Sequence, residues 1–151
     1  MFGRNFGQRK GKYNNTKVEI DGITFDSKKE SQRYLILKDA LQRGEISDLE
    51  CHKTYELIPS QKIKVTETKQ LKTKVKVIEK EKTLFMAVHF SPDFVYKNKD
   101  GKTIVEDVKG SKSKLSMSAD FPLRQKMLYA KYGLYVNIVT KATAPIGFSE
   151  V

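Results

Sequence analysis

Residues 98–101, Asn-Lys-Asp-Gly, constrain the fold of this chain most, because they lie between two strand-forming segments, 84–96 and 103–110. Both segments are rich in the β-branched and aromatic residues typical of strands. Asn at the first turn position and Gly at the fourth favour a type I turn with a left-handed fourth residue, which is the three-residue hairpin loop with a bulge. This register places Asp93 directly opposite Asp107, whereas a two-residue loop would shift the pairing and separate the two carboxylates.

The facing carboxylates indicate a cation between them. Side chains directly opposite on one sheet face lie about 4.5 to 5.5 Å apart at Cβ, and like charges there are destabilising. Lys109 is two residues after Asp107, so it emerges on the same face and offsets part of the repulsion. A divalent ion explains the pair better, since Mg²⁺ typically takes one or two carboxylates together with phosphate and water oxygens. Such an ion can activate water and stabilise charge on a phosphodiester.

Glu30 is a third candidate carboxylate, in a helix predicted over 27–43. The sequence Ser-Lys-Lys-Glu at its start has the form of a capping box. Three apolar residues share the helix face of Glu30: Tyr34, Leu37 and Leu41. Glu30 therefore either lies inward at the edge of the metal site or reaches back to cap the helix.

The remaining pattern predicts a mixed α/β domain with helices packed against a central sheet. The expected elements, in chain order, are a hairpin at 17–25, extended structure at 45–59, a lysine-rich strand pair or arm at 61–82, a second helix at 118–132 and a final strand at 134–141. We expect one domain over 17–151, because 151 residues suit a single core. Residues 1–16 carry basic residues and no acidic ones, and are expected to form a flexible basic arm.

The charge balance favours a polyanionic partner. The chain has 29 Lys and Arg against 18 Asp and Glu, a net charge of +11, which favours nucleic acid over an acidic small molecule. We expect no membrane association, since no segment has the apolar length needed to span a bilayer. The absence of a signal peptide and the single Cys51 are typical of a reducing compartment. Cys51 and His52, with His89 far away, lack the ligand spacing of a zinc site.

The motif Pro92-Asp93 followed by Asp107-Val108-Lys109 resembles the PD-(D/E)XK nuclease superfamily. The wider sequence, over residues 13–140, is similar to small bacteriophage endonucleases within it. The resemblance implies a restriction-endonuclease-like core and a Mg²⁺ or Mn²⁺ site built by Asp93, Asp107 and the backbone carbonyl of Val108. Glu30 would match the glutamate of the first core helix. Lys109 would orient or help deprotonate the attacking water and stabilise charge on the phosphate.

Several basic residues are candidates for phosphate contacts. Those that we expect to contact DNA are Lys29, Arg33, Lys112, Lys114, Arg124 and Lys126. The resemblance also implies a polar residue of the second helix that assists catalysis, either Gln125 or Lys126, although Lys126 could equally be a solvated helix residue. The loop 110–114, the segment 61–82 and the N-terminal residues could each contact phosphates or simply be solvated.

The sequence thus predicts a Mg²⁺-dependent DNA endonuclease, and the resemblance implies that it leaves 5′-phosphate and 3′-hydroxyl ends. The resemblance implies a phage enzyme in the cytoplasm of a bacterial host, acting on duplex DNA or on branched recombination or replication intermediates. Resolving a two-fold junction would call for a homodimer. The alternatives are a DNA-binding module that retains the nuclease fold without cutting, and a structural or RNA-binding phage protein, which explains only the basic charge.

Overall fold

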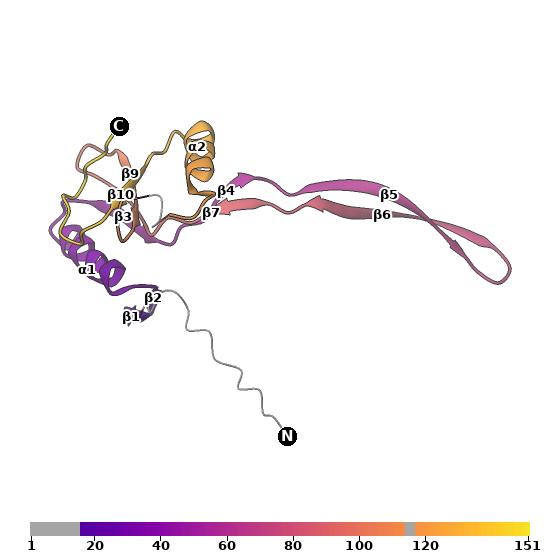
Figure 1. Ribbon diagram of the computed structural model, residues 1–151, viewed down its shortest axis with the longest axis horizontal. Coiled ribbons are helices and arrows are strands. Elements are labelled where there is room, and N and C mark those ends of the chain that lie inside the picture. The colour runs from indigo at the N-terminus through magenta and orange to yellow at the C-terminus, as the bar shows by residue number, and fades with distance from the viewer. Residues whose placement is uncertain (1–15, 114–116) are drawn as a thin grey trace, which may run out of the picture.

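A four-stranded sheet, a short N-terminal hairpin, two helices and a long hairpin arm make up the computed structural model, which describes residues 16–113 and 117–151 (Figure 1). The elements are β1 (Val18–Ile20), β2 (Ile23–Phe25), α1 (Lys28–Gln42), β3 (Ser47–Cys51), β4 (Tyr55–Ile58), β5 (Gln61–Gln70), β6 (Val75–Phe85), β7 (Val88–Phe90), β8 (Phe94–Lys97), β9 (Thr103–Val108), α2 (Phe121–Tyr132) and β10 (Val136–Val139). The predicted mixed α/β class is confirmed. No helix within the described ranges is both long and apolar enough to cross a membrane.

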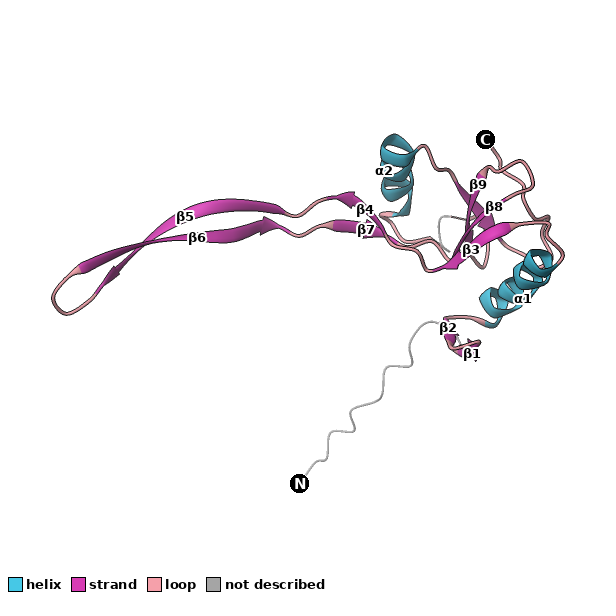
Figure 2. Cartoon of the chain, turned by 180° about the vertical axis from the view of Figure 1, so that it is seen from behind, coloured by secondary structure: helices cyan, strands magenta, loops and turns pink. Residues whose placement is uncertain are grey.

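The central sheet is mixed and has the strand order β10-β9-β8-β3. Figure 2 labels β9, β8 and β3 of this sheet. β8 runs antiparallel to β9 and β3, whereas β10 is parallel to β9 and is reached through α2, as a parallel pair requires a crossover. Alternate strand residues belong to different core clusters. Phe94 and Ile104 pack with residues of α1, whereas Val95 and Val105 pack with residues of α2.

The turn between β8 and β9 has the predicted three-residue form. The Gly101 N–H donates to the Asn98 carbonyl at 2.9 Å, and Gly101 has the left-handed φ of 75° that the bulge requires. The Asn98 side chain accepts hydrogen bonds from the N–H groups of Asp100 and Lys102. Phe94 consequently lies opposite Glu106, in the register that the sequence predicts.

The first hairpin and α1 also form as expected. Asp21 and Gly22 have φ values of 55° and 75°, which a two-residue turn with two left-handed residues requires. Helix α1 falls within the predicted range, and Gly44, with φ 69°, follows its end. The expectation that Leu41 shares the buried face of this helix is wrong. Leu41 is 39% exposed, and Ala40 takes the buried position in the last helical turn.

The lysine-rich segment is a two-stranded arm. β4 and β7 pair at its base, and β5 and β6 continue outward as an antiparallel ribbon that extends away from the rest of the fold (Figure 1). All its strand side chains are exposed except those of Val65 and Ile78, which are half-buried. This confirms the solvated strand pair predicted for 61–82.

Helix α2 follows its predicted start and stop signals. Pro122 occupies its first turn, and Gly133, with φ 67°, ends it with an N–H that donates to the Tyr129 carbonyl. Asp120 occupies the N-cap position but makes no side-chain cap bond, because its carboxylate pairs with Arg124 at 2.8 Å.

Candidate metal centre

Asp93 and Asp107 lie at the end of the β8–β9 hairpin remote from its turn. The observed register, continued one residue past Phe94, puts the two aspartates opposite each other. The Val108 N–H donates to Asp93 Oδ2 at 2.6 Å and fixes this carboxyl group against β9. Asp107 is only 4% exposed. Two acidic groups in such a position destabilise the fold unless protons or cations neutralise them.

Lys109 supplies one neutralising charge. Its Nζ lies 2.8 Å from Asp107 Oδ2, but the angles fall outside hydrogen-bond geometry, so this buried oxygen lacks a well-aligned donor among the described residues. Burial opposes the charge on Lys109, yet the contact with Asp107 and the charges of Asp93 and Glu30 outweigh burial and raise the pKa of Lys109. Lys109 is therefore protonated at neutral pH, which favours orientation and charge stabilisation over proton abstraction as its role.

Glu30 fulfils the capping alternative and also lies at the carboxylate cluster. Ser27 Oγ accepts the Glu30 N–H and donates to Glu30 Oε1, both at 3.1 Å. Glu30 Oε2 accepts the Asp26 N–H at 3.1 Å, so the box reaches one residue further back than the usual capping box. A carboxylate oxygen of Glu30 also lies within 4.8 Å of one of Asp93, so the capping glutamate adjoins the first of the two facing aspartates.

Removing the Ser27 hydroxyl should weaken this helix start. We expect Ser27→Ala to lower the free energy of unfolding by about 1 kcal/mol, because the Glu30 N–H loses its acceptor. Urea unfolding monitored by circular dichroism measures the loss. Ser27→Thr keeps the hydroxyl and is the matched control, so equal losses in the two variants would contradict the capping role.

His52 lies at the site, although its spacing from other possible ligands in the sequence does not predict a metal site. It follows β3 with a left-handed φ of 53°, and its N–H donates to the Asp93 carbonyl at 3.0 Å. Ligand atoms of Glu30, His52 and Asp93 all lie within 4.8 Å of one another, so these three residues could hold a metal ion. Local spacing carried no signal for His52, because only the pairing of β3 with β8 brings it to Asp93.

The acidity of Asp93 reflects the crowding of negative groups. Burial, then the charges of Asp107 and Glu30, raise the pKa of Asp93 to about 8, although the Val108 N–H and Lys109 act in the opposite direction. Without a metal, burial and crowding therefore favour the protonated form of the Asp93 carboxyl. A bound divalent cation would displace that proton, and carboxylate oxygens are the hard ligands that Mg²⁺ and Mn²⁺ prefer. The residues present thus fit such an ion.

The pKa of Asp93 gives the metal-free protein a defined pH dependence. The folded-state pKa of about 8 lies above the ordinary 3.8, so the contribution of Asp93 to stability is full below pH about 4 and is lost as the pH rises towards 8. We expect Asp93→Asn to remove this loss, up to about 1.4 kcal/mol per pH unit. Thermal unfolding in EDTA at pH 5 and pH 8 measures it. A stability difference between variant and wild type that stays constant with pH would contradict the expectation.

The predicted DNA contact of Arg33 is wrong, because this side chain is completely buried. Its Nε and Nη2 donate to the two carboxylate oxygens of Glu106 at 2.8 and 2.6 Å, and the Tyr96 hydroxyl donates to Glu106 Oε1 at 2.6 Å. The Arg33 guanidinium also donates to the carbonyls of Ala142, Ala144 and Pro145. The sequence position of Arg33 already indicates that it is buried, since it is three residues after Glu30 and shares the inward face of the helix.

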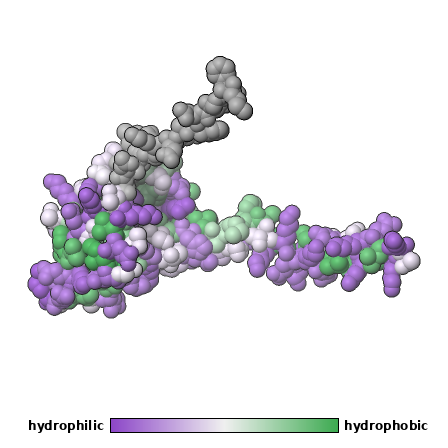
Figure 3. All heavy atoms as spheres, turned by 90° about the horizontal axis from the view of Figure 1, so that it is seen from below, coloured by the Kyte–Doolittle hydropathy of each residue, from purple (hydrophilic) through white to green (hydrophobic). Residues whose placement is uncertain are grey.

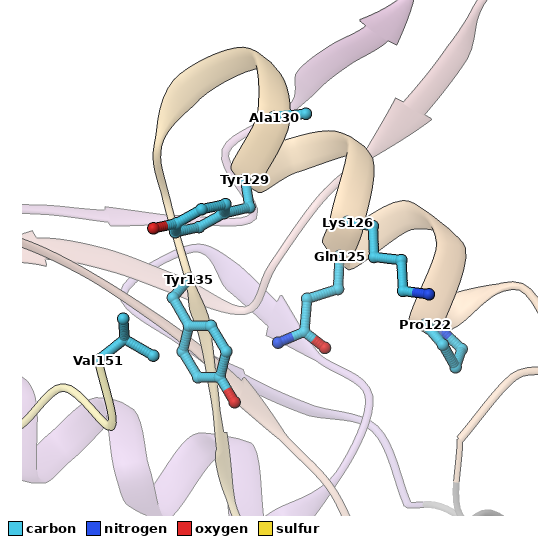
Figure 4. A pocket seen from close by; sticks show the side chains of 7 residues that line it. All are labelled: Pro122, Gln125, Lys126, Tyr129, Ala130, Tyr135 and Val151. Carbon is cyan, nitrogen blue, oxygen red and sulfur yellow. The ribbon is translucent and has the colours of Figure 1, made fainter.

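Residues of α2 form a separate pocket. Figure 4 shows Gln125 and Lys126 in the lining of this pocket, together with Pro122, Tyr129, Ala130, Tyr135 and Val151. Gln125 Nε2 donates to the Val136 carbonyl at 3.4 Å, whereas Lys126 is exposed. Arg124 is half-buried and donates to the His89 carbonyl at 3.1 Å. The assisting role of Gln125 or Lys126 and the DNA contacts of Lys126 and Arg124 stay predictions.

The other predicted phosphate contacts are Lys29, Lys112 and Lys114. Lys29 adjoins the site, since its Nζ donates to the Lys109 carbonyl at 3.4 Å. Lys112 is exposed and forms an ion pair with Glu150 at 2.6 Å, so this carboxylate competes for it with phosphate. Lys114 and the N-terminal residues 1–15 lie outside the described residues.

The chain belongs to the DUF1064 family, described as a protein of unknown function, whose family model matches residues 10–144. The matched region includes the facing aspartates, Lys109, α1 and the arm. No curated protein and no solved structure matches the chain significantly.

Proposed function

We propose that this DUF1064 protein is a metal-dependent DNA endonuclease that hydrolyses phosphodiester bonds with an attacking water. The observation that carries the proposal is the pair of aspartates facing each other across β8 and β9, with Lys109 beside them. Facing carboxylates repel DNA as well as each other, so a protein that only binds DNA has no use for them. The net charge of +11 supports a polyanionic substrate.

The fold supports the same proposal. A helix that carries Glu30, an antiparallel hairpin that carries Asp93 and Asp107, and a parallel strand reached through α2 are compatible with a restriction-endonuclease-like core. The helix glutamate adjoins the hairpin carboxylates, which is the arrangement that the motif resemblance implies.

Each residue has a role in the proposed site. Asp93, Asp107, Glu30 and the Val108 carbonyl would hold Mg²⁺, or Mn²⁺ in its place, with His52 as a further candidate ligand. The bound ion would supply a more acidic water and stabilise negative charge on the phosphate. Lys109, held by Asp107, offers its protonated amine to the phosphate, and Lys29 adds a second positive charge beside it.

Branched DNA is the proposed substrate class within this chemistry. The support is the resemblance to small phage endonucleases that process recombination and replication intermediates, together with the strongly basic charge. Action on a two-fold junction would require two copies of the site, and therefore a homodimer.

A gel assay tests the proposal. Supercoiled plasmid and a synthetic four-way junction are incubated with wild type or Asp107→Asn, in Mg²⁺ or in EDTA. We expect cleavage by wild type in Mg²⁺ alone, none by the variant, and faster cleavage of the junction. DNA binding without cleavage in any divalent metal would instead establish the non-catalytic DNA-binding module.

A further inference from the structure

We propose that the β5–β6 arm is a second DNA-binding surface, which grips the backbone of duplex DNA about one helical turn from the carboxylate cluster. The inference rests on the proposed function for the identity of the partner. The arm projects from the fold, and nearly all of its strand side chains are exposed to solvent (Figure 1).

The two faces of the arm differ in charge. Because side chains alternate along each strand, the register divides the charged residues of β5 and β6 into two sets. We call one set the basic face, with four lysines against one glutamate: Lys69, Lys76, Lys80, Lys82 and Glu67. The opposite face is balanced, with two lysines against two glutamates: Lys62, Lys64, Glu79 and Glu81. Positive charge is therefore concentrated on one side of the ribbon.

The outer end of the arm carries an unfavourable charge pair. Lys69 lies directly opposite Lys76, and like charges in that position destabilise a hairpin. Lys72 and Lys74 follow in the turn, and residues 68–78 contain no acidic residue. The fold gains nothing from this arrangement, whereas a polyanion would neutralise it.

The dimensions of the arm suit duplex DNA. The major groove is about 12 Å wide and admits a two-stranded ribbon. The ten residues of β5 span about 34 Å, close to one turn of B-DNA.

An isolated two-stranded hairpin is only marginally stable in water, so a bound partner would stabilise the arm. Figure 3 shows hydrophilic residues along most of the arm, with smaller hydrophobic patches between them. A second copy of the arm is disfavoured as that partner, because two basic ends repel.

The arm is joined closely to the candidate metal centre. β7 ends at Phe90, three residues before Asp93, and β4 begins at Tyr55, three residues after His52. At this junction, the Thr54 and Ser91 hydroxyl oxygens lie 2.9 Å apart in a hydrogen bond. DNA held by the arm would therefore extend from the reacting phosphate along one side, over about 10 base pairs.

Paired charge variants test the proposal without requiring catalysis. K69Q/K76Q removes two charges from the basic face, whereas the control K62Q/K64Q removes two from the balanced face. Binding to a labelled duplex of about 30 base pairs is followed by fluorescence anisotropy in EDTA over a range of salt. We expect K69Q/K76Q to bind about tenfold more weakly and to lower the salt slope by about 2, with the control close to wild type. Loss of the Lys69–Lys76 repulsion should leave thermal stability unchanged or higher, so unfolding cannot explain the effect.

The outcomes separate this inference from the proposed nuclease. Salt slopes equal to that of wild type in both variants would overturn the arm assignment and leave the plasmid assay unaffected. Failure of wild type to cut DNA, with the slope difference intact, would overturn the nuclease and leave the arm as a DNA-binding element. A dimer seen by sedimentation that responds to K69Q/K76Q, with no change in salt slope, would assign the arm to a second copy and overturn the inference.

Discussion

Lys109→Met is expected to reduce Mg²⁺-dependent DNA cleavage by roughly 10²- to 10³-fold, because a positioned positive charge that stabilises the reacting phosphate is worth about that factor in rate. Methionine keeps most of the partly buried stem of Lys109 and removes only the ammonium that pairs with Asp107. Metal binding should persist or become tighter, because the carboxylates lose a competing cation.

Lys29→Met is the matched control for this prediction. Lys29 lies beside Lys109 and donates to its carbonyl, but makes no ion pair with the facing aspartates. Its loss should slow cleavage less than about tenfold, as expected of one phosphate contact. Single-turnover rates at saturating Mg²⁺ measure both variants. Equal losses would show that Lys109 contributes only general positive charge.

Arg33→Met is expected to lower the free energy of unfolding by about 3 to 5 kcal/mol. The substitution leaves the buried Glu106 carboxylate without its two guanidinium bonds and leaves three carbonyls of the C-terminal segment without their donor. Burial opposes the charge of Arg33, but the bonds and charge of Glu106 outweigh it and raise the pKa of Arg33 further, so the guanidinium remains charged.

Arg43→Met is the matched control, because Arg43 pairs with Asp39 and Glu45 on the exposed surface. Such pairs contribute about 0 to 1 kcal/mol. Adding Glu106→Gln to Arg33→Met should restore part of the lost stability, since the uncompensated charge is removed. Chemical denaturation of the three variants measures these differences. A loss in Arg33→Met no larger than in Arg43→Met would contradict the structural role.

Local signals in the sequence predicted the elements that position the site. Asn98 and Gly101 fixed the register of the β8–β9 hairpin, and with it the opposition of Asp93 and Asp107. Ser27 and Glu30 marked the start of α1 through their reciprocal bonds. These features were predictable because each depends on residues close together in the chain or on one turn type.

Long-range packing decided what the sequence did not reveal. His52 reaches Asp93 only because β3 pairs with β8, and local patterns do not specify that pairing. The positive charge of Arg33 and its place near Glu30 predict a phosphate contact, whereas its actual partners Glu106 and Tyr96 come from distant strands. A charged residue on the inward face of a helix is better explained by a buried partner, because burying an unpaired charge is costly.

The central claim, that the facing aspartates belong to a divalent-cation site, is tested most directly by calorimetric titration of Mn²⁺ into metal-free protein. Wild type, Asp107→Asn and the exposed turn variant Asp100→Asn are compared at one pH. We predict binding of Mn²⁺ to wild type and Asp100→Asn alike, with affinity at least about tenfold weaker in Asp107→Asn, because one hard oxygen ligand is lost. Identical isotherms for wild type and Asp107→Asn, or no binding by wild type, would contradict the claim.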